Sequence, residues 1–398
     1  MRHAIHNGHV LGATAFAAPL IGAYAPLGLA PLAVVAALAA VVVRRTTGGP
    51  WPVPRRGVAY ILGAALVWAL ASTAWGIEPP ASALNGVLRL ALVMLSGLVT
   101  IEVAAGLTPT ERETVRRGLL AGLGLALVLV AIDRAFDAPI RRLLPMSPAI
   151  AAPGYVMENF NRGISYVAMV AFPAAAVLWR RHGPVAALLL WAATFVLTLV
   201  LTSGSAQLGM ALGAITFAIV LVAPRVGGRI VAAGLTVLVL AMPLLASAIP
   251  PPDKLPPVGA LPIPNSGHHR LQIWRFAADR IVERPLLGWG YDASRSIPGA
   301  NVSLAKSEPA LPLHPHNVML QWWLELGVVG GVLGAALMMA IAGAMRRGIP
   351  DRMGFAAANG QFVVAFVIGA LAFGAWQGWW VAALLLSGAV TAATTDRA

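Results

Sequence analysis

The chain alternates long apolar runs with short polar loops, and one polar stretch is much longer than the others. A membrane-spanning helix needs about 20 largely apolar residues. About a dozen runs approach or exceed this length: 9–23, 26–43, 57–75, 84–105, 116–132, 163–179, 184–202, 205–223, 229–248, 316–344, 354–372 and 375–393. The pattern therefore predicts an all-α polytopic membrane protein with about 12 transmembrane helices.

The long polar stretch, 249–315, divides the chain into three parts. We expect about nine transmembrane helices in 1–248, a large loop containing short helices in 249–315, and about three helices in 316–398. Within the loop, the spacing predicts an amphipathic helix over 266–284 that is capped by Ser266. Its apolar face is expected to hold Leu271, Trp274, Ala278 and Ile281.

Arginine clusters in every second loop predict the orientation of the chain. They are Arg44, Arg45, Arg55, Arg56, Arg112, Arg116, Arg117, Arg180, Arg181, Arg225, Arg229, Arg346, Arg347 and Arg352. Cytoplasmic loops carry an excess of arginine and lysine, so we expect these loops and both termini in the cytoplasm. The 249–315 loop then faces the opposite side. A secretory signal at Arg2 would also fit the N-terminal pattern, but the many following spans favour a retained first helix.

Composition excludes two broad classes of protein. The chain is 59% hydrophobic and 11% charged, with a mean hydropathy of +0.79, whereas a soluble domain is about 25% charged. The net charge of +13 does not indicate nucleic-acid binding, because the arginines lie at the ends of apolar spans. Cysteine is absent, so there is neither a disulfide framework nor a thiol nucleophile.

Two residues of the large loop are candidates for chemistry. Arg270 lies in the first turn of the predicted loop helix, where a forked donor would favour phosphate oxygens. The alternative is a solvated arginine, or one paired with Asp279 or Glu283. His316 lies where the chain re-enters the membrane and could act as a general base near neutral pH. The alternative is a histidine that only bonds a backbone carbonyl.

Three further charged residues lie within or near the ends of predicted spans, where an unpaired charge is costly. Arg162 and Arg89 lie towards the outer side and could face a polar cavity, snorkel to the interface or, for Arg162, pair with Glu158. Glu325 falls inside a helix and needs a partner. Five tryptophans are expected at the membrane interface: Trp322, Trp323, Trp376, Trp379 and Trp380. Small-residue pairs, Gly118/Gly122 and Gly327/Gly331, predict close helix packing.

A metal site is the competing hypothesis for the loop. His268, His269, His314 and His316 share it with Glu308, but their spacing matches no zinc signature. No Asp-x-Asp pair is present to hold a diphosphate through a metal. The sequence therefore predicts neither a metal nor a cofactor.

Three motifs resemble those of the O-antigen ligase and O-antigen polymerase superfamily. They are Arg270-x-x-x-Trp274, Pro285-Leu286-Leu287-Gly288-Trp289-Gly290, and His316-Asn317-x-x-Leu320-x-x-x-x-Glu325-x-Gly327. Asn161-Arg162-Gly163 looks like an arginine region of that family. One departure is Ser203-Gly204-Ser205, where many relatives carry a Ser-Arg pair, and Arg89 is the candidate to replace that arginine.

The resemblance implies a bacterial inner-membrane glycosyltransferase whose site faces the periplasm. It would move a glycan from undecaprenyl diphosphate to a sugar hydroxyl of lipid A-core, with neither nucleotide nor metal. Arg162 and Arg270 would hold the diphosphate, with Arg275 and Arg89 assisting, and His316 would activate the acceptor. The remaining members of the site, as supporting residues, would be His314, Asn317, Glu325 and Trp274. A polymerase of the same superfamily is the alternative, and a lipid-linked sugar transporter or flippase is a more distant one.

Overall fold

The computed structural model describes residues 5–54, 56–144, 160–257, 259–260, 263–305 and 308–396. The described part is helical except for one short antiparallel pair, β1 (Ser303–Ala305) and β2 (Glu308–Pro309). The α-helices are α1 (Asn7–Tyr24), α2 (Leu29–Thr46), α3 (Arg56–Ala71), α4 (Pro80–Ala105), α5 (Pro109–Ala135), α8 (Phe160–Val200), α9 (Gly204–Val222), α10 (Pro224–Ser247), α11 (Asn265–Glu283), α12 (Val318–Gly348), α13 (Arg352–Leu371) and α14 (Gly378–Thr394). The 3₁₀ helices are η1 (Pro26–Gly28), η2 (Ser72–Ala74), η3 (Arg141–Leu143), η4 (Pro252–Lys254) and η5 (Ala293–Ser296).

The polytopic helical architecture is confirmed. Within the described residues, nine helices are long and apolar enough to cross a membrane. One of them, α8, has non-helical backbone at Gly183 and so consists of two arms. Each of the twelve predicted spans coincides with a helix or with one arm of α8.

Small residues allow α1 and α5 to pack closely. A Cβ atom at Gly118 would lie 2.2 Å from the carbonyl oxygen of Gly12, and one at Gly122 would lie 2.2 Å from that of Phe16. Any side chain there would separate the two backbones. The predicted close packing at this pair is confirmed.

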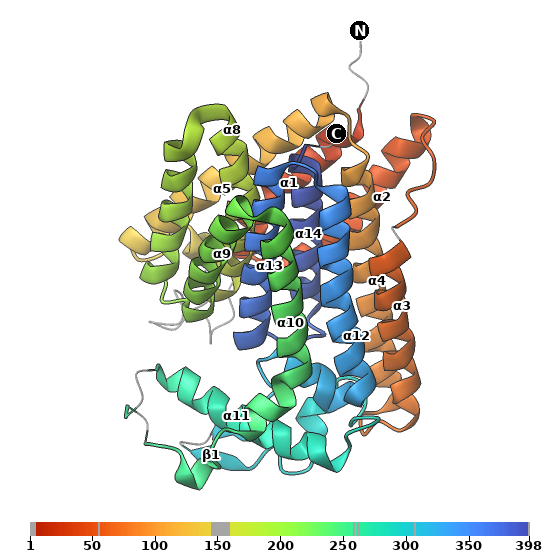
Figure 1. Ribbon diagram of the computed structural model, residues 1–398, viewed down its shortest axis with the longest axis vertical. Coiled ribbons are helices and arrows are strands. Elements are labelled where there is room, and N and C mark those ends of the chain that lie inside the picture. Colours follow the sequence, from red (N-terminus) through yellow and green to blue (C-terminus); the bar gives the residue numbers. More distant parts are fainter. Residues whose placement is uncertain are drawn as a thin grey trace.

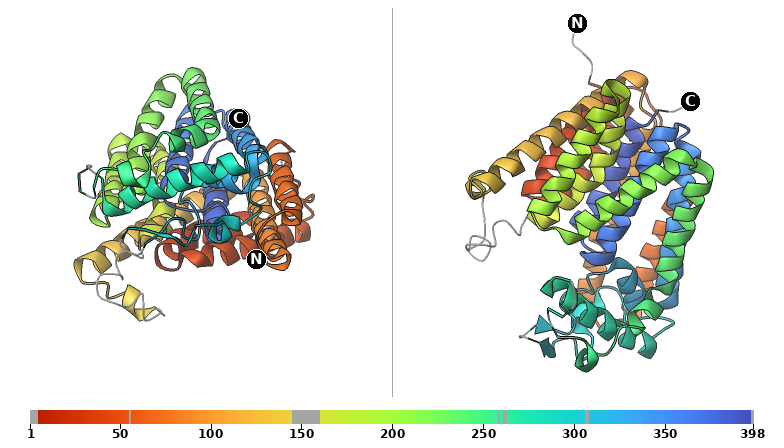
Figure 2. Two further views of the ribbon diagram at one scale, coloured as in Figure 1. Left: turned by 90° about the horizontal axis from the view of Figure 1, so that it is seen from below. Right: turned by 60° about the vertical axis from the view of Figure 1, so that its left-hand side comes forward.

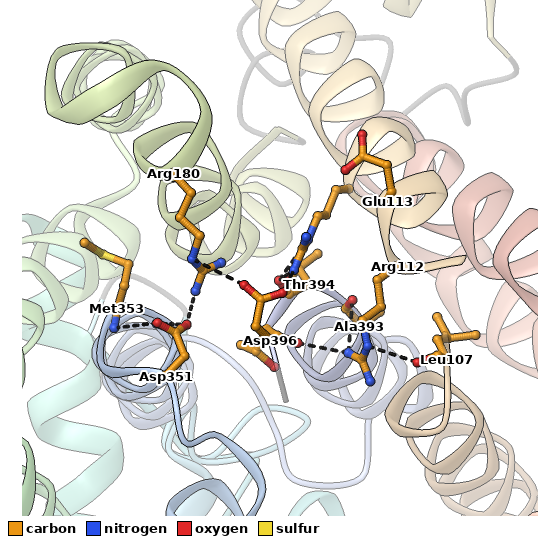
Figure 3. Close-up of polar contacts among 12 residues, drawn as sticks. Leu107, Arg112, Glu113, Arg180, Asp351, Met353, Ala393, Thr394 and Asp396 are labelled. Atoms are coloured by element: carbon orange, nitrogen blue, oxygen red, sulfur yellow. Dashed lines mark hydrogen bonds and ion pairs between the residues drawn. The ribbon is translucent and has the colours of Figure 1, made fainter. Parts of the chain in front are cut away.

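The start of α1 and the end of α14 lie at one end of the bundle (Figure 1). The Arg112 guanidinium donates to the carbonyls of Ala392, at 2.7 Å, and Thr395, at 3.0 Å. Arg180 forms ion pairs with Asp351 and Asp396, and Figure 3 shows these contacts converging on the C-terminal segment. Arg112, Arg116 and Arg180 thus lie beside the C-terminal segment, and the cytoplasmic orientation of this end stays a prediction.

The segment between α10 and α12 covers the opposite end of the bundle, and α11 crosses that end when seen from below (Figure 2). The predicted loop helix is present, but its details differ from the expectation. Its N-cap is Pro264, not Ser266, and Ile273 and Ala277 are buried on its inner face while Leu271 is only half-buried. The tryptophan expectation also needs correction, because Trp380 is 1% exposed and is packed inside the bundle rather than at an interface.

A break in α12 receives the loop 285–290. Gly327 adopts φ 63° and ψ −156°, which interrupts the helical hydrogen bonds. The loop replaces them: the amide of Trp289 donates to the Leu324 carbonyl at 3.0 Å, and the amide of Val328 donates to the Pro285 carbonyl at 2.9 Å. Gly327 therefore marks a helix break rather than the helix-packing site that its spacing with Gly331 predicted. Gly331 lies against the Trp323 ring of its own helix.

Gly288 is required at this junction for two reasons. Its φ is +72°, a conformation that L-residues rarely adopt. A Cβ atom there would also lie 2.4 Å from the carbonyl oxygen of Glu325. The glycine at position 288 of the motif is thus explained by the close approach of two backbones.

We predict that Gly288→Ala lowers stability by about 3 kcal/mol, because it adds backbone strain and a clash. Gly259→Ala is the matched control: its φ is +92°, but nothing lies within 4 Å of the added Cβ. That variant should cost about 1 kcal/mol. Thermal unfolding in detergent micelles measures both, and equal shifts would contradict the proposed clash.

Candidate active site

Two histidine rings meet in the turn that leads into α12. The ring centroids of His314 and His316 are 4.4 Å apart. His316 has a φ of 55°, a left-handed conformation that is strained for a residue other than glycine. Such strain persists only where the surroundings hold the residue in place, and it is concentrated at functional sites.

Hydrogen bonding fixes the tautomer of His316. Its Nδ1 lies 2.9 Å from the carbonyl oxygen of Ala372, in the connection between α13 and α14. A carbonyl oxygen only accepts, so Nδ1 carries the proton and Nε2 keeps its lone pair. No hydrogen-bond partner of Nε2 occurs in the described part of the chain. The ring therefore presents a free base.

The surroundings keep His316 neutral. Burial lowers its pKa, the bond to Ala372 opposes this, and the positive charge of Arg270 and the His269 ring lower it further. The pKa of His316 thus lies below its ordinary value of 6.5. At pH 7 the imidazole is unprotonated and can accept a proton.

His314 supports its neighbour instead of acting as a base. Its Nδ1 accepts the backbone amide of His316 at 3.1 Å, and the side-chain amide of Gln377 lies 3.0 Å from its Nε2. Burial, followed by the charges of His316, Arg295 and Arg162, lowers the pKa of His314 to about 3. Both ring nitrogens are occupied, so His314 holds the turn in place.

Three arginines from separate segments surround the histidines. Arg162 is exposed in the first turn of α8, and its positive charge helps to lower the pKa of His314. Arg270 of α11 is half-buried, and it makes no ion pair or hydrogen bond to any described residue. Arg295 of η5 lies 3.4 Å from Asp292 and was missed by the sequence analysis. The structure therefore brings Arg162 and Arg270 together with His314 and His316.

The other two predicted arginines differ in their surroundings. Arg275 donates to the carbonyls of Ser247, at 2.6 Å, and Ile249, at 3.0 Å, and pairs with Asp279. It therefore stabilises the end of α10. Arg89 is exposed on α4 and has no hydrogen bond or ion pair to the described residues.

Trp274 and Asn317 fix the ends of the histidine turn. The Trp274 indole donates to the Pro315 carbonyl at 3.0 Å. Asn317 is fully buried, and its side-chain oxygen accepts the amide of Leu320 at 3.0 Å, which caps α12. Both residues orient His316 through the backbone.

Glu325 of α12 joins three segments beneath the turn. Its side chain is fully buried and accepts the backbone amides of Asp292, at 2.6 Å, and Ser294, at 3.2 Å. It also accepts the Ser294 hydroxyl, the Trp376 indole and, at 2.9 Å, the Gln321 amide. Gln321 in turn accepts the backbone amide of Ala375 at 2.7 Å. The predicted need of Glu325 for partners is met by donors that sequence spacing did not reveal.

The four histidines of the loop do not gather at one point. His268 bonds the Pro256 carbonyl at 2.7 Å, and His269 bonds the Pro309 carbonyl at 3.1 Å. In the described part of the chain, no group of three or more His, Cys, Asp or Glu side chains is arranged to hold a metal ion. The guanidinium of Arg270, which has no protein partner among the described residues, suits an anionic ligand.

Comparison with known proteins supports a relation to polysaccharide ligases. Residues 186–335 match the family model described as O-antigen ligase. A protein of Rickettsia conorii provisionally named polysaccharide ligase is 26% identical over 276 residues, which is 68% of this chain and 64% of that protein. One of the same provisional name from Rickettsia felis is 27% identical over 323 residues, or 79% of this chain and 75% of that protein. The chain thus aligns with less than two thirds of the first relative's length.

We predict that Glu325→Gln destabilises the protein by about 2–4 kcal/mol, because an amide cannot accept all five donors. Glu283→Gln is the matched control, since Glu283 pairs with Arg280 and its side chain is 44% exposed. It should cost about 0.5 kcal/mol or less. Thermal unfolding measures both changes. A loss no larger than that of the control would show that the Glu325 network adds no stability.

We predict that Arg270→Gln raises the pKa of His316, because it removes a nearby positive charge that opposes protonation. The effect can be measured by NMR titration of ¹³C-labelled histidine, with His316→Gln used to assign the signal. Arg280→Gln, on the same helix, is the control and should leave the titration unchanged. An unchanged His316 titration in Arg270→Gln would show that the two side chains do not interact.

Proposed function

We propose that this chain, a member of the O-antigen ligase superfamily, transfers a glycan from undecaprenyl diphosphate to a hydroxyl group of lipid A-core. The observation that carries the proposal is the free Nε2 of a neutral His316 next to Arg270, a cation without a protein partner. A base and unpaired cations are what a transfer from a diphosphate requires.

Arg162 and Arg270 bind the diphosphate in this proposal. Arg162 lies in the first turn of α8, where the helix N-terminus also favours negative charge. A half-buried guanidinium without a carboxylate partner is costly and is offset when an anion binds. The positive charge of Arg295, which pairs with Asp292, also acts on His314, whereas Arg275 is occupied by the carbonyls that end α10.

The reaction proceeds with one proton transfer. The acceptor hydroxyl gives its proton to Nε2 of His316, and its oxygen attacks the anomeric carbon of the glycan. The bond from that carbon to the diphosphate oxygen breaks, and the diphosphate leaves with its electron pair. The arginines stabilise the charge that develops on this leaving group. Attack from the face opposite the leaving group inverts the anomeric configuration.

Under this proposal, the site lies at the periplasmic face of the bacterial inner membrane. The support is that α11, which carries Arg270, and the end of α14, where Arg112 contacts the C-terminal segment, lie at opposite ends of the bundle (Figure 1). Arginine-rich loops face the cytoplasm, so the histidine turn would face the periplasm. This is the side on which lipid-linked glycans and lipid A-core would meet.

We predict that His316→Gln lowers kcat about 10²–10⁴-fold, since it removes the general base. Arg162→Gln and Arg270→Gln should lower kcat/KM, with Arg270→Lys less impaired than Arg270→Gln. The assay combines purified protein, undecaprenyl-diphosphate-linked glycan and lipid A-core in the presence of a chelator. Arg280→Gln, which lies on the same helix and removes an Arg280–Glu283 pair, should remain within about twofold of wild type.

Several outcomes of this assay would contradict the proposal. Full activity of His316→Gln would remove His316 from the mechanism, and loss of wild-type activity in the chelator would favour a metal site. Extension of the lipid-linked glycan without lipid A-core would identify a polymerase. Movement of the lipid-linked glycan across vesicles without any transfer would identify a flippase.

A further inference from the structure

Two leucines of the motif at 285–290 project away from the fold. Leu286 is 68% exposed and Leu287 is 47% exposed. Their backbone is nevertheless held closely. A Cβ atom at Gly327 would lie 2.2 Å from the Leu286 carbonyl oxygen, and the Trp75 indole donates to the Leu287 carbonyl at 3.3 Å. The loop therefore presents two apolar side chains in a fixed position that packing within the protein does not explain.

A third aliphatic residue extends this exposed surface. Val282, near the end of α11, precedes Leu286 by four residues and is 74% exposed. Exposed large apolar side chains that gather in an otherwise polar segment mark a surface that contacts a membrane or another molecule. We call Val282, Leu286 and Leu287 the apolar patch.

The length of α12 after its break sets the depth of the patch. The arm at 328–348, which follows Gly327, rises about 30 Å, and this equals the thickness of the hydrocarbon core of a bilayer. Arg346 and Arg347 lie in the last turn of this arm. The loop 285–290 bonds the first residue of the arm. The loop therefore lies at the membrane interface opposite those two arginines.

The neighbouring helix α3 gives the same depth. With η2 it forms a span of 19 residues, Arg56–Ala74, which rises roughly 28 Å. Trp75, the residue after it, bonds the Leu287 carbonyl, and tryptophan is enriched at membrane interfaces. Only 11% of the apolar window of α3 is buried in the protein, and the helix lies at the edge of the bundle (Figure 1). Lipid therefore surrounds the end of α3 that the loop contacts.

One arginine beside the patch has no acidic partner. Arg284 is exposed, and its guanidinium carbon lies 4.1 Å from the centroid of the Trp289 ring. Its side chain makes no ion pair or hydrogen bond to any described residue. The nearby charges of Arg280 and Glu283 pair with each other. Stacking on the indole holds the guanidinium in place and leaves its N–H groups free for phosphate oxygens.

We propose that the apolar patch inserts among the lipids of the leaflet on the side of the histidine turn, and that Arg284 binds the phosphate of an anionic phospholipid there. Apolar side chains next to basic ones are typical of segments that lie in a membrane interface. The contact fixes the end of α11, the helix that also carries Arg270. The assignment requires no glycan transfer, so it stands or falls separately from the proposed function.

Single-cysteine labelling tests the insertion, because the chain has no cysteine of its own. Leu286→Cys and Leu287→Cys are labelled with a bimane fluorophore in nanodiscs that hold one protein each. Phospholipids brominated in their acyl chains should quench both labels. Dissolved iodide should quench them about threefold less than it quenches a label at Asp253→Cys.

Asp253 is a suitable control because it is exposed and charged, and because it follows α10, whose 24 residues alone rise about 36 Å. Iodide quenching at Leu286→Cys and Leu287→Cys that equals this control would overturn the insertion. Protection of both labels from iodide and from brominated lipid would show burial against protein and would overturn it as well.

A label at Val282→Cys tests whether the leucines hold the segment in the membrane. Adding Leu286→Asn and Leu287→Asn should remove about half or more of its quenching by brominated lipid. Val302→Asn is the matched control, since Val302 is 58% exposed in the same polar segment, and it should leave the quenching unchanged. Unchanged quenching in the double variant would reject the anchoring role of the leucines.

Discs that mix phosphatidylglycerol with phosphatidylcholine test Arg284. When only phosphatidylglycerol carries bromine, its quenching of a label at Leu287→Cys should exceed its share of the disc about twofold or more. Arg284→Gln should remove this excess. Lys254→Gln, which removes an equal charge from an exposed position of the same segment, should retain it. Absence of the excess, or its survival in Arg284→Gln, would overturn the phosphate contact.

Discussion

The site depends on the hydrogen bonds that the buried carboxylate of Glu325 accepts. It accepts donors from η5, from the connection between α13 and α14, and from Gln321 of its own helix. Those segments carry the groups that hold the two histidines: Ala372 and Gln377 follow α13, and Arg295 follows Ser294. A charge removed from water is stable only when fully hydrogen-bonded. The network therefore fixes the segments in one arrangement, because any other leaves that charge short of donors.

The break in α12 makes this arrangement possible. A continuous helix would use the carbonyls of Leu324 and Glu325 internally, but Gly327 frees them for Trp289 and Gly290. The loop 285–290 is thereby docked against α12, and its backbone amides satisfy the carbonyls that the break leaves free. The same docking sets the start of η5, whose amides reach Glu325. The break at Gly327, the loop 285–290 and the Glu325 carboxylate are therefore linked by one set of hydrogen bonds.

The sequence predicted the features that arise locally and missed those that depend on distant contacts. Each apolar run is recognisable within its own residues, so each predicted span coincides with a helix or with one arm of α8. Gly327 was misread because a glycine pair at four-residue spacing looks the same in a packed helix and at a break. Gln377 lies 63 positions from His314, and no local pattern joins them. Arg270 was singled out by its place at the start of the loop helix, His316 by its place before an apolar span, and Arg162 by its charge at the start of another.

The arginines at the two ends of the bundle differ in what balances their charge. Arg112 and Arg180 bond carbonyls or carboxylates of the C-terminal segment and α13, so their charges serve the fold. Arg270 is half-buried at the other end with neither kind of partner among the described residues, yet an arginine cannot lose its proton to escape the cost. A buried charge that has no protein partner is retained only where another group balances it. An anionic ligand beside His316 is the partner that this arrangement leaves room for, because it would balance the charge of Arg270 where no described protein group does.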